Sequence, residues 1–179
     1  GNRETLADGT AHQARHLLGR CGQLVAGERR TGGLAQQLDV PGIEAALLTD
    51  DAEPLRATLE VKGRTIAIER AAEGVAWSDF DALCARPLGA ADYLAIAVEF
   101  HALLLENVPV FSDDERNEAQ RFMALVDALY EHKTLLVMSA EAEPDALCRA
   151  KDVAFAFRRT ASRLVEMRTA AYLAGHHRR

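Results

Sequence analysis

The stretch that decides the fold runs from residue 101 to residue 138 and reads HALLLENVPVFSDDERNEAQRFMALVDALYEHKTLLVM. It begins with a predicted buried strand, formed by residues 101–105 together with 108–110, and ends with the apolar run 134–138, which is typical of a strand in a parallel sheet. Between them, Ser112 and Glu115 form an S-x-x-E capping box that predicts the start of a helix. One face of that helix is apolar and carries Ala119, Phe122, Met123, Val126, Leu129 and Tyr130. Strand, helix and strand make a βαβ unit, so we expect an α/β fold with a small, mostly parallel sheet and flanking helices.

Upstream of this unit the sequence predicts a β-hairpin. Residues 55–61 alternate between apolar and polar side chains, and residues 65–68 form a second short strand. The two flank residues 62–64, where Gly63 is expected to adopt a positive φ. Residues 78–84 read as a short helix after a Ser or Asp cap, and residues 90–100 as an apolar helix.

The remaining segments divide the chain into two parts. Residues 1–54 are expected to form a helical and loop segment, with a helix over 10–29 and turns over 39–54. Residues 55–179 are expected to form the α/β domain. Its last helix is predicted over 158–173, with an inward face composed of Ala161, Leu164, Val165 and Tyr172.

Composition excludes several classes of protein. The chain has 179 residues, and 21 Lys and Arg against 27 Asp and Glu give a net charge of −6. Binders of the nucleic-acid backbone are normally basic, so we expect no nucleic-acid partner. No apolar run approaches the roughly 18 to 20 residues of a membrane helix, and no secretory leader is visible. The chain starts with Gly1 rather than Met, so we expect a piece of a longer protein.

The cysteines indicate a reducing compartment. Cys21, Cys84 and Cys148 are odd in number and far apart, and no C-x-x-C pair exists. We expect small buried side chains rather than disulfides or metal ligands, and therefore a cytoplasmic protein.

Motifs for nucleotide or metal chemistry are absent from the sequence. G-x-x-x-x-G-K-S/T requires a lysine after a glycine, and none of Lys62, Lys133 and Lys151 follows one. His12 and His16 lack an acidic or cysteine partner at ligand spacing, so we expect no metal site. This chain alone should therefore hold no cofactor.

Arginines offer the clearest candidates for a functional site. Arg158, Arg159 and Arg163 stand near the start of the predicted last helix. A cluster of guanidinium groups can clamp a phosphate or a carboxylate. The alternative is a solvated helix face whose arginines pair with Asp152 or Glu166, and the sequence leaves both interpretations open.

The capped helix and the strand before it raise two further points. Arg121 is expected to pair with Glu118, three residues earlier. Strand, helix, strand and arginine-bearing helix imitate the second half of an ATPase core, with Glu106 and Asn107 where an acid pair would hold magnesium. Because Pro109 follows at once, we interpret this as a structural echo and not as a metal site.

Six runs of sequence, in order, resemble a known family. They are residues 87–97, 108–109, 116–122, 125–131, 139–144 and 159–167. Together they are similar to the C-terminal half of the ZapE-like cell-division ATPases, an AAA-type family that includes the mitochondrial lactation-elevated ATPases. The resemblance runs from about Val61 to His176, while residues 1–54 match poorly.

The resemblance implies the C-terminal part of a P-loop ATPase whose Walker A, Walker B and first sensor motifs lie upstream. A family member would bind ATP and Mg²⁺, form a homo-oligomer and act on the tubulin-like division-ring protein FtsZ. This part would supply oligomer and partner contacts. If any of its residues takes part in hydrolysis, we expect Arg159 or Arg163 to reach the nucleotide of a neighbouring subunit as an arginine finger. The alternative is a stand-alone, non-enzymatic interaction module that has lost the ATPase half.

Overall fold

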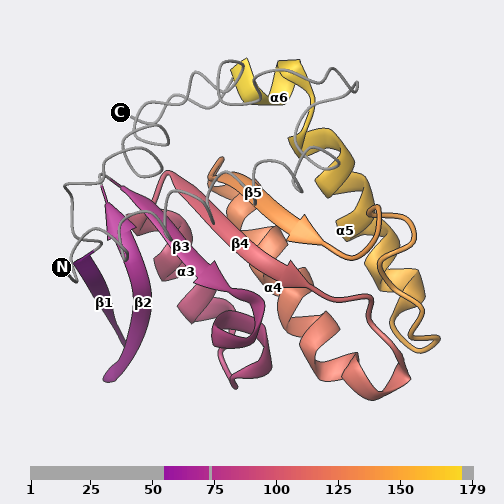
Figure 1. Cartoon of the computed structure of the whole chain (residues 1–179), viewed down its shortest axis with the longest axis horizontal. Coiled ribbons are helices and arrows are strands. Elements are labelled where there is room, and N and C mark those ends of the chain that lie inside the picture. The colour runs from indigo at the N-terminus through magenta and orange to yellow at the C-terminus, as the bar shows by residue number, and fades with distance from the viewer. Residues whose placement is uncertain (1–54, 73, 175–179) are drawn as a thin grey trace, which may run out of the picture.

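The structure, a computed structural model, describes residues 55–72 and 74–174. Their centre is a five-stranded sheet of order β1-β2-β3-β4-β5 (Figure 1). The strands are β1 (Leu55–Val61), β2 (Arg64–Ala72), β3 (Val75–Asp79), β4 (Ala102–Val108) and β5 (Leu135–Ala140). The helix and turns expected over residues 10–54 lie outside the described residues.

The hairpin of β1 and β2 confirms the expectation for this region. Lys62 and Gly63 form a two-residue turn with φ of 49° and 77°. Positive φ at both central residues gives the turn the twist that matches the flanking strands. Ala57, Leu59 and Val61 pack against the core, whereas the residues between them are exposed.

The expectation of a mostly parallel sheet is partly wrong. The pairings β1–β2 and β2–β3 are antiparallel, and only β3–β4 and β4–β5 are parallel. The reason is the length of the connections, because a tight turn can join only antiparallel strands. The turn before β3 contains Gly74 at φ 79°, where a Cβ atom would lie 2.6 Å from Nδ1 of His101. Strand β3 itself was not expected.

The connections between the parallel strands are helical. A π-helical turn (η2, Asp81–Ala85) and α3 (Ala90–Glu99) join β3 to β4, and α4 (Arg116–Glu131) joins β4 to β5. This confirms both the βαβ unit and the helix expected over 90–100. The turn η3 (Asp113–Glu115) precedes α4, and its capping box is present, since the amide and hydroxyl of Ser112 donate to Glu115 Oε2 at 2.9 and 2.8 Å.

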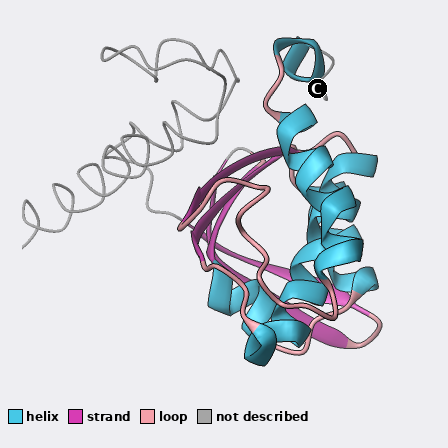
Figure 2. Ribbon diagram, turned by 90° about the vertical axis from the view of Figure 1, so that its right-hand side faces the viewer, coloured by secondary structure: helices cyan, strands magenta, loops and turns pink. Residues whose placement is uncertain are grey.

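The helices and one face of the sheet enclose the main core (Figure 2). In Figure 1 α3, α4 and α5 lie behind the strands, side by side. At the centre four phenylalanine rings pack at centroid distances of 5.4 to 6.3 Å. They are Phe80, Phe111, Phe122 and Phe157. Of the α4 face predicted from the sequence, Ala119, Phe122, Val126 and Leu129 are buried, while Met123 and Tyr130 are half-buried.

The last predicted helix is in fact two. Helix α5 (Ala154–Met167) begins earlier than expected, and α6 (Ala170–Ala174) follows a break. Thr169 produces the break, because its hydroxyl oxygen accepts a hydrogen bond from the amide of Tyr172 at 3.2 Å and so starts a new helix. Leu164 and Tyr172 are buried as expected, but Val165 is 42% exposed. Val165 lies beside the buried face of α5 rather than on it, and that face consists of Phe157, Thr160, Leu164 and Met167.

The other face of the sheet carries a second set of buried side chains, among them Val75, Trp77, Leu104 and Val137. The guanidinium of Arg70 lies 5.1 Å from the Trp77 ring centre. Among the described residues, the indole Nε1 of Trp77 is buried without a hydrogen-bond partner. Both faces of the central strands are therefore apolar, as expected for the run 134–138.

Candidate functional site

The arginines singled out from the sequence lie where α5 packs on α4. Arg163 is the more enclosed, with a side chain that is 11% exposed. Its guanidinium donates to Asp127 Oδ1 and, at 3.0 Å, to Glu131 Oε1, and it lies 4.7 Å from the ring centre of Tyr130. Two carboxylates and one aromatic face therefore fix its position and compensate its charge.

Arg159 lies one turn earlier and is oriented outward. Its side chain is 66% exposed, and its Nη2 is 3.8 Å from the second oxygen of Asp127. Arg158 is also exposed and stacks over the ring of Phe155 at 4.8 Å. Of the two candidate arginines, only Arg159 has a guanidinium with room for a further anionic partner. The trans role predicted for one or the other of them stays a prediction.

The pairings differ from those weighed on the sequence alone. Asp152 is bound by Arg116 at 2.6 Å, and Glu166 accepts a hydrogen bond from the Tyr130 hydroxyl at 2.9 Å. This hydrogen bond is the main reason why the pKa of Tyr130 is raised, since it stabilises the protonated phenol. The expected pair of Arg121 and Glu118 is present at 3.4 Å.

A second polar group lies where the parallel strands end, the edge at which open α/β sheets bind ligands. Asn107 adopts φ 59° and connects two neighbouring strands. Its side-chain Nδ2 donates to Asp79 Oδ2 of β3 at 2.7 Å, and its backbone N–H donates to the hydroxyl oxygen of Ser139 of β5 at 2.9 Å. Glu106 is the register partner of Asp79 in β4.

The described side chains at this edge offer oxygen atoms that can accept hydrogen bonds, but they do not form a metal site. Among the described residues no group of three histidine, cysteine or acidic side chains is placed to hold a metal ion. Glu106 and Asn107 were weighed from the sequence, but Asp79 was assigned to the start of a short helix, because strand β3 was not expected. A short apolar run after Gly74 was the available signal.

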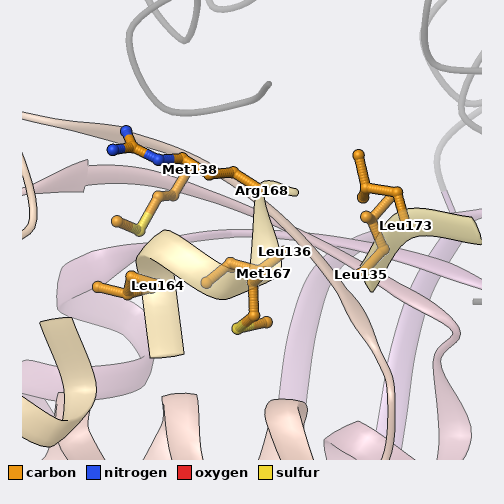
Figure 3. A pocket seen from close by; sticks show the side chains of 7 residues that line it. All are labelled: Leu135, Leu136, Met138, Leu164, Met167, Arg168 and Leu173. Atoms are coloured by element: carbon orange, nitrogen blue, oxygen red, sulfur yellow. The ribbon is translucent and has the colours of Figure 1, made fainter. Parts of the chain in front are cut away.

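Cys84 is fully buried, and burial raises the pKa of its thiol from 9.0 to about 12, which makes it unreactive. Cys148 is half-buried, both thiols are free, and Cys21 lies outside the described residues. A pocket of about 20 Å³, enough for about one water molecule, lies between β5, α5 and α6, and Figure 3 shows the side chains that line it. Its walls are Leu135, Leu136, Met138, Leu164, Met167, Arg168 and Leu173.

Sequence comparison identifies the family. The profile of the AFG1-like ATPases matches residues 39–176, which is most of the chain. The chain belongs to the AFG1-like ATPase family. The match begins upstream of Val61, where the resemblance seen in the sequence begins.

Curated relatives agree with this assignment. Lactation elevated protein 1 homolog B of Danio rerio is 33% identical over 146 residues, covering 64% of this chain and 29% of that protein. Cell division protein ZapE of Escherichia coli K12 is 36% identical over 121 residues, covering 68% of this chain and 30% of that protein. The chain thus spans less than a third of the length of these relatives. No solved structure matches it. In the described part of the chain, no helix has both the length and the apolarity to cross a membrane.

Proposed function

We propose that this chain is the C-terminal part of a ZapE-like ATPase and supplies oligomer and partner contacts for ATP-dependent action on the cell-division ring. The observation that carries the proposal is the AFG1-like match over residues 39–176 in a chain that contains no P-loop motif. ATP and Mg²⁺ are then bound by an upstream half, the protein works in the cytoplasm, and FtsZ is the partner.

The role of this part in hydrolysis falls to Arg159. An arginine supplied by a neighbouring subunit neutralises charge that develops on the γ-phosphoryl oxygens. Arg159 extends outward, whereas Arg163 is enclosed by Asp127 and Glu131 and holds α5 against α4. Asp127 contacts both guanidinium groups, so it also orients Arg159.

A stand-alone interaction module is the second candidate. The missing P-loop and the charge-compensated Arg163 favour it. The gene upstream of Gly1 separates the two proposals. A GxxxxGKS/T motif followed by an acidic Walker B motif supports the ATPase part, and a start codon close to Gly1 supports the module.

The chain on its own should neither bind Mg-ATP tightly nor hydrolyse it. Without a backbone nest and its lysine there is no preorganised site for the transferring phosphoryl group. Isothermal titration calorimetry of the 179-residue chain with Mg-ATP should show no binding in the micromolar range. A micromolar dissociation constant would overturn this expectation.

In the full-length protein, Arg159→Ala should lower turnover by about 10³ or more, with nucleotide affinity and oligomer size intact. Arg158→Ala is the matched control, because Arg158 is also exposed on the same helix but interacts with Phe155. Arg163→Ala should lower the melting temperature, since it removes the ion pairs by which α5 is held to Asp127 and Glu131 of α4. Equal turnover for the Arg159 and Arg158 variants would rule out the finger.

A further inference from the structure

Strand β1 lies at one side of the sheet and has a strand partner, β2, on one side only within the described residues. The two-residue turn makes Val61 and Arg64 the closing pair, whose backbone groups face each other. Backbone groups alternate in direction along an antiparallel strand. Those of Thr58 and Glu60 therefore point away from β2, toward the side where the described residues hold no further strand. Arg56 stands at a shift of register, but Leu55 and Ala57 on either side of it both pair with β2, so its backbone groups point away as well.

The side chains of these three residues form a self-complementary pattern. Arg56 and Glu60 lie two residues to either side of Thr58, and all three are exposed on the same face of the sheet. If a second β1 pairs antiparallel about Thr58, Arg56 of each strand lies opposite Glu60 of the other. Opposite charges in directly facing positions attract, and like charges repel. In the same register, on the core-facing side, the half-buried Ala57 of each copy lies opposite the half-buried Leu59 of the other.

We propose that a second copy of this chain docks on the β1 edge, with the two strands antiparallel and centred on Thr58. Three residue pairs then exchange backbone hydrogen bonds, and two reciprocal ion pairs join Arg56 to Glu60. The result is a two-fold symmetric dimer with one continuous sheet. This goes beyond the proposed function, because the pairing needs neither nucleotide nor an upstream half.

The charges also select the register. Charged residues on an edge strand usually prevent pairing between sheets. Pairing centred on Arg56 or on Glu60 places like charges face to face, and a slip of the centre to residue 59 places Arg56 opposite Lys62. Only the Thr58 register brings both charges opposite their complement.

The hairpin presents this edge on a fixed base. At its end the guanidinium of Arg64 donates to both oxygens of Asp92 on α3, at 3.0 and 2.8 Å. The pairing involves few residues from each copy, and stable interfaces bury about 1,200 to 2,000 Å². The dimer is therefore weak and depends on protein concentration.

Charge exchange tests the proposal directly. Arg56→Glu alone and Glu60→Arg alone each create two like-charge pairs, so the dimer dissociation constant should rise about tenfold or more. The double variant Arg56→Glu/Glu60→Arg should restore it to near the original value. Arg86→Glu, the same substitution at an exposed site away from the hairpin, should leave it unchanged. Sedimentation equilibrium of the 179-residue chain at several concentrations measures all four.

A second measurement identifies the surface. Hydrogen exchange of the amides of Arg56, Thr58 and Glu60 should slow as protein concentration rises, and should not do so in the single variants. A chain that stays monomeric at about millimolar concentration overturns the proposal, as does a folded double variant that fails to regain association. Either failure leaves the proposed ATPase role standing, because that role is tested by nucleotide turnover.

Discussion

Asp92 combines a fully buried carboxylate with a partner that reaches it from the surface. Its side chain is 0% exposed, whereas that of Arg64 is 56% exposed. The same carboxylate accepts a hydrogen bond from the amide of Gly89 at 2.8 Å and so caps α3. One side chain thus starts a helix and ties that helix to the hairpin.

Arg64→Ala should lower the free energy of unfolding by about 2 to 4 kcal/mol, because it leaves a buried charge without its counter-ion. The exposure of Arg64 keeps the figure below that of a fully buried pair. Arg86→Ala, at an exposed arginine, is the control. Urea denaturation measures the stability of both variants. If Arg64→Ala loses no more stability than the control, Arg64 is not the counter-ion that stabilises the buried Asp92.

The double variant Arg64→Ala/Asp92→Asn separates charge from packing. A neutral amide can still accept the hydrogen bond from Gly89 and costs less to bury than an unpaired carboxylate. It should therefore be more stable than Arg64→Ala alone.

Side-chain contacts within a few residues could be predicted from the sequence, and distant ones could not. The capping box of Ser112 and the pair of Arg121 with Glu118 follow from helix geometry alone. The partners of Arg163 lie on another helix, Asp127 being 36 residues away. Local spacing therefore suggested Glu166, while packing of α5 on α4 selected other acids.

Among elements, those with long and regular patterns were predicted well. Helix α4 has its apolar stripe and cap, and β4 and β5 each begin with an apolar run, 102–105 and 135–138. Strand β3 was missed because five residues, Val75–Asp79, are too few to show a period. The break between α5 and α6 was missed because a threonine cap inside an apolar pattern is a weak signal.

Phe122→Ala should cost about 3 to 5 kcal/mol, because α4 contributes this ring to the phenylalanine cluster and it is 0% exposed. Phe155→Ala is a matched control on α5. That ring is 79% exposed, so its loss should change stability by less than about 0.5 kcal/mol. Thermal melting of both variants checks the expectation, and an unchanged melting temperature for Phe122→Ala would show that the α4 face is assigned wrongly.

At the scale of the whole molecule, the sequence allowed the α/β class and the family to be predicted, but not the mixture of strand directions. Strand direction depends on where each connection goes, and the tight turn at Gly74 reverses the chain before a strand that was not expected. The contacts among Asp79, Asn107 and Ser139 could not be predicted from the sequence for the same reason, because these residues come from three different strands.

Stability should fall in alkaline solution. Burial raises the pKa of Cys84 from 9.0 to about 12, and burial also raises the pKa of Tyr93. The unfolded chain loses these protons first, so the stabilisation is complete below about pH 9 and is lost as pH rises toward 12. Urea midpoints measured from about pH 8 to about pH 11 should decline.

The variant Cys84→Ala should show a shallower decline over the same range. Cys148→Ala removes a half-buried thiol, so its urea midpoint should decline with pH more steeply than that of Cys84→Ala. If all three proteins decline equally, Cys84 is not the source.

Trp77 is the single tryptophan of the chain, and it lies in the middle strand of the sheet, opposite the helices. Its indole is 7% exposed, beneath the guanidinium of Arg70 and beside Leu104. The tryptophan fluorescence of this protein therefore comes from one known place. Emission at short wavelength reports an intact sheet centre, and a red shift reports that water has reached it. An optical signal of this kind follows the opening of the sheet without any attached dye.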